Sequence, residues 1–431
     1  MSTDVDVVVV GAGVAGLTAA HELRKAGRRV CVLEAADRVG GRMATTRQDG
    51  FVIDTGAEQL SERGYDATWA LLAELGVGPS ELPRIGQWAG VWRDGRFRRG
   101  LAHPLGLITG AGLSARARLD LIGVLRDRYD FDRPEEAGAE TVAGFAARHH
   151  PDLLDYLCQP VVAGFCGWDP ERSAAGPFLA LLTSIGPSSG WRAYRGGTDL
   201  LARVLAERLD VGLSCPVDEV VAGSLSARVF AGSTEVRARS VVLAVPAPVV
   251  RRIYANPPAH EVPFLAASTY VPVVKVHLVL DRRLSAGVYL GVVPRVASRT
   301  LASVLFDHLK HPDRAPAGRG LVTLVAHPSV AGRLLAAPDG EAADVLVTAA
   351  EEFVPGLRAA TTGVVVHRFR DGLPEATPRA LALRAGFAAR AGGVVDYAGD
   401  WVGVMPSSEA AVRSGRRAAA RVLAARRKER V

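Results

Sequence analysis

The chain has 431 residues, of which 48% are hydrophobic and 23% charged, so it is long enough for two domains and a large buried core. Its net charge of +7 could indicate nucleic acid or an anionic membrane surface as a partner. Much of the excess lies in two basic tracts without interleaved stacking aromatics, Arg93–Arg99 and Arg426–Arg430. We therefore expect no nucleic-acid binding, and weak peripheral membrane contact stays open.

Targeting and metal-binding patterns are also missing from the sequence. Asp4 and Asp6 interrupt the region where a signal peptide needs a long apolar core, and no run of about 20 apolar residues follows. The adjacent His149 and His150 would point to different faces of a helix, and no third ligand lies at metal spacing. The four cysteines show no CxxC spacing. We expect a cytoplasmic protein without a metal site.

The N-terminal stretch has the pattern of a dinucleotide-binding strand, turn and helix. The apolar run Asp4–Val10 predicts a strand, and the helical stretch Leu17–Ala26 follows a GAGVAG turn. Gly11 permits the turn, Gly13 lets the backbone approach a pyrophosphate, and Gly16 lets the helix pack against the strand.

The residues around this turn complete the expected cofactor contacts. Val14 and Ala15 lie in the turn, and the N-terminus of the following helix would face the phosphates with its free N–H groups and positive dipole end. A second strand is predicted at Arg29–Leu33. Glu34 follows it, with Ala35 beside it, and a carboxylate in this position accepts hydrogen bonds from ribose hydroxyls.

The next residues distinguish FAD from NAD. Leu33–Met43 reads LEAADRVGGRM, which resembles the FAD-binding signature of the flavin amine oxidase superfamily. That superfamily also includes protoporphyrinogen oxidases and phytoene desaturase-like enzymes. By this resemblance Gly41 lies against the cofactor and Arg42 neutralises a pyrophosphate charge. Ala36 departs from the pattern, because amine oxidases often carry Arg there.

The resemblance continues through a strand at Phe51–Asp54, after which Gly56 and Ala57 would bring small residues close to the flavin ring. An amphipathic helix is then predicted at Tyr65–Gly76 and a hairpin at Gln87–Phe97.

A helical region follows, and apolar spacing of three to four residues predicts its members. These are Ala115–Tyr129, Thr141–His149, Asp152–Gly164 and Ala175–Ile185. Gln159–Pro170 (QPVVAGFCGWDP) resembles a segment of protoporphyrinogen oxidases. Its Phe165 and Trp168 are either core residues or substrate-cavity wall, and we favour the core.

The chain is then expected to return to the cofactor domain. Tyr194–Leu200 (YRGGTDL) resembles the re-entry point of desaturases and protoporphyrinogen oxidases and leads into a helix at Leu200–Leu209. In the family, a valine placed like Val217 binds the adenine through its backbone. Strands are predicted at Ala227–Phe230 and Glu235–Val245. A second insert carries strand candidates at Pro272–Leu280, Gly287–Val293, Leu301–Phe306, Leu321–Ala326 and Gly363–Phe369, with helices at Val330–Leu335 and Ala342–Phe353.

Lys275 is the candidate catalytic residue. It lies in an apolar strand, where a lysine is costly unless it reaches water or is paired. Flavin amine oxidases have a similar strand whose lysine holds a water beside flavin N5 and assists reoxidation by oxygen. The alternative is a strand with one solvated face shared by Lys275 and His277.

The C-terminal region resembles the closing motif of the family. Val394–Gly399 predicts a strand, and Asp400 after Gly399 would bond the ribityl chain. A helix then begins near Ser407, and its dipole at Glu409 and Ala410 would stabilise the N1/O2 edge of reduced flavin. No cysteine or histidine lies here, so FAD should be bound without a covalent link.

One family feature is missing from this region. Amine oxidases often place an aromatic residue before the helix glutamate as half of a cage for the amine. Here the residues are Met405, Pro406, Ser407 and Ser408. The cage is absent unless Trp401 or a residue of another strand replaces it.

Together these patterns predict an α/β protein. Residues 1–76, 194–256 and 386–431 would form a Rossmann-like FAD-binding domain of the glutathione-reductase type, and residues 77–193 and 257–385 an inserted α+β substrate domain. We expect hydride transfer to FAD from a largely apolar small molecule, at a C–N bond with O2 or another acceptor. The alternatives are dehydrogenation of a C–C bond and a redox-neutral flavoprotein. The oligomeric state is not predicted.

Overall fold

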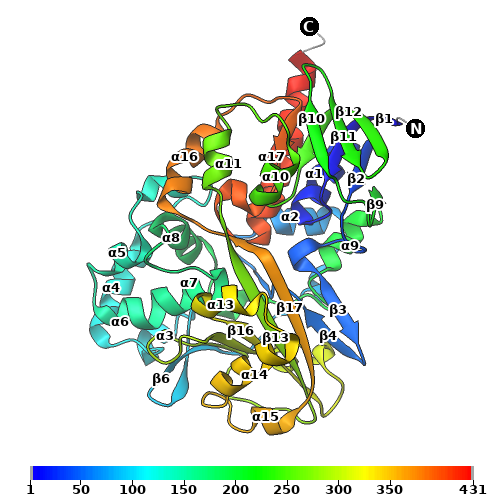
Figure 1. The fold of residues 1–431 in the computed structure, drawn as a ribbon. Coiled ribbons are helices and arrows are strands. Elements are labelled where there is room, and N and C mark those ends of the chain that lie inside the picture. Colours follow the sequence, from blue (N-terminus) through cyan, green and yellow to red (C-terminus); the bar gives the residue numbers. More distant parts are fainter. Residues whose placement is uncertain (1–2, 429–431) are drawn as a thin grey trace.

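The computed structural model describes residues 3–428, which contain two seven-stranded sheets with helices packed around them (Figure 1). The first sheet has the order β10-β11-β12-β1-β2-β9, and β18 pairs with β12. β1 runs parallel to β2 and β12, and the sheet is therefore Rossmann-like, with an antiparallel β10-β11-β12 extension. The strands are β1 (Thr3–Val10), β2 (Val30–Leu33), β9 (Asp210–Gly212), β10 (Glu219–Ala222), β11 (Ala227–Ala231), β12 (Thr234–Leu243) and β18 (Val395–Tyr397).

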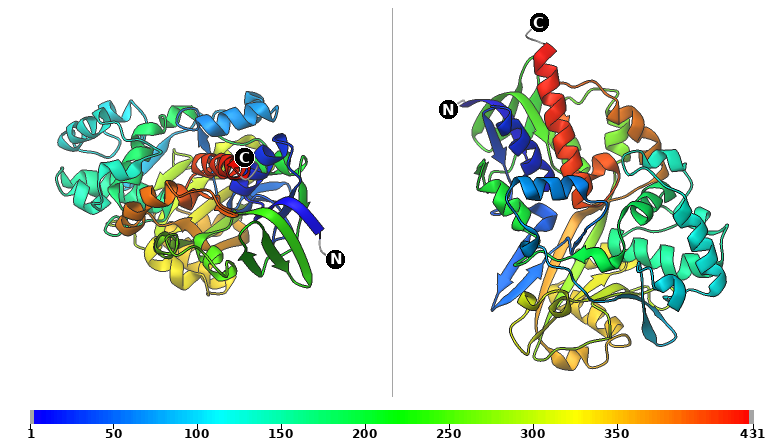
Figure 2. Two further views of the ribbon diagram at one scale, coloured as in Figure 1. Left: turned by 90° about the horizontal axis from the view of Figure 1, so that it is seen from above. Right: turned by 180° about the vertical axis from the view of Figure 1, so that it is seen from behind.

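Helices from both ends of the chain pack side by side against this sheet. Figure 2 shows α17 (Ser408–Lys428) beside α1 (Val14–Lys25). The two backbones approach closely at Gly415, where an added Cβ would lie 2.4 Å from the carbonyl oxygen of Ala15. α2 (Asp66–Glu74) packs against α17, and α9 (Leu200–Ala206) against α1. The C-terminal helix is thus held to the first βα unit.

The second sheet combines strands from two distant parts of the sequence, in the order β17-β13-β16-β15-β14-β6-β7. The β6–β7 hairpin joins its edge, because β6 runs parallel to β14. α13 (Pro328–Leu334) and α14 (Asp339–Ala350) pack on the sheet. The strands are β6 (Ala89–Arg93), β7 (Arg96–Arg99), β13 (Tyr270–Leu280), β14 (Leu290–Val292), β15 (Leu301–Phe306), β16 (Gly320–Ala326) and β17 (Thr361–Pro374).

The helical region contains a π-helix that the apolar spacing does not predict. The predicted helix Asp152–Gly164 lies within a continuous helical run, which consists of α6 (Pro151–Leu153), a π-helix over Leu154–Cys158, and α7 (Gln159–Cys166) with Pro160 in its first turn. The other helices of the region are α3 (Gly106–Thr109), α4 (Ala115–Arg126), α5 (Val142–Ala146) and α8 (Ala175–Ser184).

Short elements complete the described part of the chain. They are β3 (Thr45–Gln48) with β4 (Phe51–Asp54), β5 (Leu60–Ser61) with β8 (Trp191–Arg192), α10 (Ala247–Ile253), α11 (Val262–Ala267), α12 (Asp307–Lys310), α15 (Leu357–Ala360) and α16 (Pro378–Ala388). Within residues 3–428, no helix has the length and apolarity that crossing a bilayer requires. The side chains of the basic tract Arg426–Arg430 lie outside the described part.

Candidate functional site

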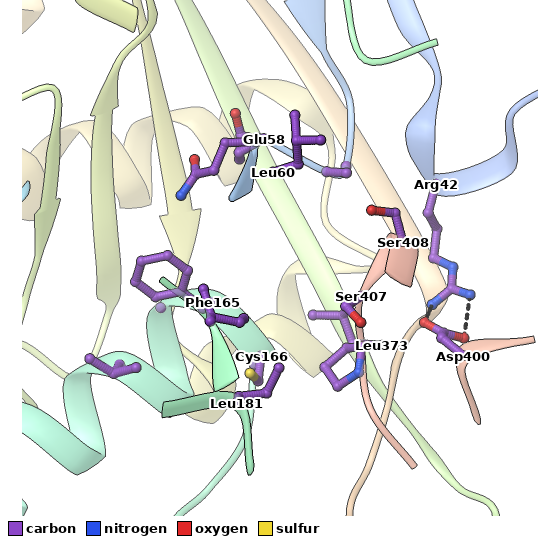
Figure 3. A pocket seen from close by; sticks show the side chains of 18 of the residues that line it. Arg42, Glu58, Leu60, Phe165, Cys166, Leu181, Leu373, Asp400, Ser407 and Ser408 are labelled. Carbon is purple, nitrogen blue, oxygen red and sulfur yellow. Dashed lines mark hydrogen bonds and ion pairs between the residues drawn. The ribbon is translucent and has the colours of Figure 1, made fainter. Parts of the chain in front are cut away.

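A cavity of about 940 Å³ extends from the first βα turn to the helical region. Figure 3 shows the Arg42–Asp400 pair on one side of it and Phe165, Cys166 and Leu181 on another. The first part is lined by glycines and charged residues, the second mainly by apolar side chains. This division fits a cofactor at one end and an apolar substrate at the other.

The glycines of the first turn have different environments. Gly11 has φ +103°, and Gly16 packs so closely that an added Cβ would lie 2.1 Å from the carbonyl oxygen of Gly11. An added Cβ at Gly13 would meet no protein atom within 4 Å, and Gly13 lines the cavity. Gly13 also precedes α1 without a side-chain cap on the first-turn N–H groups. The turn therefore leaves room for a pyrophosphate where a helix N-terminus favours negative charge.

Glu34 is fixed at the same end of the cavity. Its Oε2 accepts a hydrogen bond from the N–H of Ala12 at 2.7 Å, and its Oε1 accepts one from the N–H of Ala36 at 2.9 Å. Each carboxylate oxygen can accept a second hydrogen bond. The residues present thus fit a dinucleotide with ribose hydroxyls.

Arg42 and Asp400 form a bidentate ion pair on one side of the cavity, with two N–O distances of 2.8 Å. The Arg42 Nη1 also donates to the carbonyl oxygen of Gly372 at 3.1 Å. Asp400 therefore already balances the guanidinium charge that the sequence assigned to a pyrophosphate. The pair ties the loop after β2 to the loop after β18.

Most of the predicted cofactor residues line this one cavity. They are Gly11, Gly13, Val14, Ala15, Glu34, Gly41, Arg42, Gly56, Ala57, Gly399 and Asp400, together with the candidate catalytic Lys275. The lining does not include Gly16, Ala35, Val217, Glu409 and Ala410.

The side chain of Glu409 has a clear structural task. It is fully buried and accepts hydrogen bonds from the backbone N–H groups of Ala67 and Thr68, at 3.0 and 2.9 Å. It therefore caps α2 and is turned away from the cavity. The neighbouring Ser407 and Ser408 line the cavity at the start of α17.

Lys275 is 5% exposed and reaches the cavity from β13. Its Nζ donates to the carbonyl oxygen of Gly56 and to Oε1 of Glu58. The second carboxylate oxygen of Glu58 accepts from Nζ of Lys310 at 2.7 Å. Glu58 therefore bridges two lysines, and one of them faces the cavity.

The second lysine belongs to a buried ionic cluster. Lys310 Nζ lies 3.0 Å from Asp54, and Arg314 lies 3.1 Å from the same carboxylate oxygen. Burial opposes the charged carboxylate of Asp54, but Lys310 and Arg314 together hold its pKa below the usual value. Burial likewise opposes the charge of Lys310, but Glu58 and Asp54 raise its pKa. We infer that Asp54 and Lys310 stay ionised at neutral pH.

The alternative of a solvated strand face for Lys275 and His277 is wrong. His277 is fully buried, and its Nδ1 lies 2.8 Å from the hydroxyl of Thr323. Burial, with the nearby His367 and Lys275, lowers the pKa of His277 well below its usual value. The ring is therefore neutral, and this face of β13 lies against buried polar groups.

The two aromatic residues of Gln159–Pro170 have different positions. Phe165 lines the cavity and contacts Trp191 edge to face, with ring centroids 5.9 Å apart. Trp168 is fully buried, and its Nε1 donates to the carbonyl oxygen of Pro374 at 2.9 Å. Core placement is right for Trp168 and wrong for Phe165.

Trp401 does not replace the missing cage residue, because its ring is buried. It is 1% exposed, stacks with Phe264 and lies against Phe387 and Tyr397. Its Nε1 donates to the carbonyl oxygen of Val245 at 3.2 Å. The ring is thus held in an aromatic cluster, although the residue borders the cavity.

Sequence reasoning missed Glu58 as the partner of Lys275, and Lys310 as the second lysine that binds Glu58. Glu58 is in the DTGAE turn but had no role there, and Lys310 lies in a charged stretch typical of a surface. Glu58 is 217 residues from Lys275 and 252 residues from Lys310 in the chain, so no local pattern indicates these contacts.

Comparison with known proteins gives the class to which this site belongs. The sequence model of the family described as flavin containing amine oxidoreductase matches residues 14–423, so the chain belongs to this family. It is a flavoprotein oxidoreductase with FAD as its cofactor.

Individual relatives are similar over shorter regions. The mitochondrial protoporphyrinogen oxidase of Nicotiana tabacum is 34% identical over 169 residues, 38% of this chain and 33% of that protein. The putative flavin-containing monoamine oxidase AofH of Mycobacterium tuberculosis is 40% identical over 152 residues, 35% of this chain and 31% of that protein. The matches thus span about a third of these relatives. A structure of wild-type putrescine oxidase bound to putrescine has the same fold, with a TM-score of 0.77 and 23% identity over 98% of this chain and 100% of that one.

Proposed function

We propose that the protein oxidises a C–N bond of a largely apolar amine, with O2 as electron acceptor. The observation that carries this proposal is the buried Lys275, held in the cavity by Glu58. When bound, FAD would accept a hydride from the substrate carbon, and the resulting imine would hydrolyse to a carbonyl compound and an amine or ammonia. Non-covalent binding of FAD, the cytoplasmic location and the two discontinuous domains remain parts of this proposal.

The first task of the protein is to hold the cofactor. Gly13 and the N-terminus of α1 would accept the pyrophosphate, Glu34 a ribose, and Asp400 the ribityl chain. Gly56 and Ala57 would let the backbone lie against the flavin ring. The apolar walls around Phe165 and Leu181 exclude water and orient the substrate.

Lys275 supplies a fixed positive charge beside the reacting centre. Its ammonium group donates to Glu58 and Gly56, so its position is set by two partners. A cation held in a buried cavity stabilises developing negative charge more strongly than one in water. This supports a role in the reduction of oxygen.

The same cluster favours the uncharged form of the amine. Glu58 is the carboxylate next to Lys275, and two lysines already balance its charge. An ammonium substrate would add a third cation without a free carboxylate partner. We propose that the amine binds as the free base, which is also the form that can release a hydride from its α-carbon.

Dehydrogenation of a C–C bond is the second candidate. It is favoured by Ser407 and Ser408 at the start of α17, where amine oxidases often carry an aromatic cage residue, and by the burial of Trp401 in its aromatic cluster. An apolar cavity suits both reactions.

Anaerobic mixing of the flavin-loaded protein with primary, secondary and tertiary amines tests the proposal. We expect loss of oxidised-flavin absorbance with at least one apolar amine, at a rate that rises with pH as the amine loses its proton. Air should then restore the absorbance with formation of hydrogen peroxide. Bleaching only by a cyclic or polyene hydrocarbon-like donor would favour the second candidate, and no bleaching by any donor would contradict both.

A further inference from the structure

A polar side chain lies in the apolar wall of the cavity, away from the charged cluster. Ser303 on β15 lines the cavity and is fully buried, and its Oγ has no hydrogen-bond partner in the protein. Buried hydroxyl groups usually have a partner, because leaving one unpaired costs free energy. An unpaired hydroxyl in the wall of a ligand cavity would therefore gain a hydrogen bond from a ligand group that reaches it.

Strand register places Ser303 on the same face as Lys275. Lys275 pairs with Val325 across β13 and β16, and Val325 pairs with Ser303 across β16 and β15. Residues directly opposite in an antiparallel sheet share a face, and all three line the cavity. Two strand spacings separate Ser303 from Lys275, about 10 Å.

The surroundings of Ser303 are apolar. On the same sheet face its neighbours are Val325, Leu305 and Leu290, which also line the cavity. α7 packs above it at Gly164, where an added Cβ would lie 3.6 Å from Cβ of Ser303 and 3.2 Å from Val292. Glycine at this position thus lets the backbone of α7 approach Ser303 closely, with no side chain between them. A charged ligand group here would lose its hydration without gaining an ionic partner.

We propose that Ser303 forms the polar end of the substrate cavity and binds a neutral hydroxyl group on an otherwise apolar substrate. The substrate would then have its oxidised carbon near Lys275 and its hydroxyl group about 10 Å away, with an apolar body between them. This inference rests on the proposed function, because it takes the cavity as the substrate site, and it narrows the substrate class. A second ammonium group at the Ser303 end is disfavoured.

Matched ligands and variants test the proposal. The probes are alkylamines of six to ten carbons, the corresponding ω-amino alcohols and α,ω-diamines. Affinity is measured from perturbation of the flavin spectrum without oxygen and, independently, from the rise in melting temperature. We expect the best amino alcohol to bind about tenfold more tightly than the alkylamine of the same length, as one added hydrogen bond would give.

Ser303→Ala should reduce this preference to twofold or less while leaving the affinity for the alkylamine unchanged. The control is Ser173→Ala, because Ser173 is also fully buried with an unpaired Oγ but does not line the cavity. This control should keep the preference. Because Ser303 makes no hydrogen bond in the protein, its alanine variant should melt at or above the wild-type temperature.

Three results would overturn the assignment of Ser303: equal affinity for amino alcohol and alkylamine in the wild type, tighter binding of the diamine, or a clear loss of thermal stability in Ser303→Ala. Binding of linear alcohols and of chloroalkanes of equal length tests the Ser303 subsite without an amine. It therefore separates a wrong assignment of Ser303 from a failure of the protein to oxidise amines. A preference for the alcohol that depends on Ser303, without flavin reduction by any amine, would support the subsite and contradict the proposed reaction.

Discussion

Lys275 and Glu58 form a buried ion pair that joins β13 to the turn after β4, 217 residues away in the chain. The lysine side chain is 6% exposed and the glutamate 16%. Lys310, which does not line the cavity, binds the other oxygen of Glu58 and so fixes the position of this carboxylate. The position of the candidate catalytic cation therefore depends on a structural cluster, formed by Asp54, Lys310 and Arg314, that does not line the cavity.

Replacing Lys275 by methionine should slow the reaction of the reduced protein with oxygen. The change removes the cation but keeps the length of the side chain, and we expect the reoxidation rate to fall at least tenfold, about 1.4 kcal/mol of barrier. Stopped-flow flavin absorbance after chemical reduction measures it. Lys25→Met, at an exposed lysine paired with Glu74, is the control. Equal rates in all three proteins would exclude Lys275 from oxygen chemistry.

Asp54→Asn should strongly destabilise the protein. The variant leaves Lys310 and Arg314, both fully buried, without a shared carboxylate. Breaking a buried ion pair on one side costs about 3–5 kcal/mol. Urea unfolding measures the change. Asp344→Asn removes the partner of Arg358 at a site where the carboxylate is 65% exposed, and it should cost less than about 1 kcal/mol. Similar losses in both variants would contradict a structural role for the buried cluster.

Alanine at Gly13 and at Gly16 should have different effects. At Gly13, with φ −72° and no protein atom near an added Cβ, alanine should leave the flavin-free protein as stable as wild type but reduce its flavin content. At Gly16 the added Cβ lies 2.1 Å from the oxygen of Gly11, so stability should also fall, by about 1–3 kcal/mol. The ratio of flavin absorbance to protein absorbance measures the flavin content of each variant, and denaturation curves measure its stability. Full flavin content in Gly13→Ala would contradict a pyrophosphate at this turn.

Local patterns predicted the parts of the structure that depend on neighbouring residues. The strands Phe51–Asp54 and Leu301–Phe306 have the bounds that their apolar runs indicate, and Gly11, Gly13 and Gly16 form the expected turn. Lys275 was recognised because a lysine is unusual in an apolar strand. Its partner Glu58 was not, since this carboxylate reaches Lys275 and Lys310 only through the packing of three distant segments.

Local patterns also do not indicate the direction in which a side chain points. Glu409 follows the family motif, but whether its carboxylate caps α2 or faces the cavity depends on where α2 packs. Ser303 looks like any serine in a strand, and only the register with Val325 shows that it shares a face with Lys275. The predicted helix Asp152–Gly164 lies within a continuous helical run, but apolar spacing does not indicate the π-helix before Pro160.

His327 should make the protein less stable in mild acid. Burial and the nearby Arg295 lower its pKa to about 4, and its neutral Nδ1 caps α13 by accepting from the N–H of Ser329. The unfolded chain binds a proton near pH 6.5, so the stabilising contribution is complete above that pH and is lost as the pH falls toward 4. Between about pH 8 and pH 5 the loss is about 2 kcal/mol.

His327→Asn keeps a capping group without a titrating ring and should flatten the dependence of unfolding free energy on pH by this amount. If urea unfolding at several pH values gives the same slope for His327→Asn and wild type, His327 is not among the groups that set the acid sensitivity.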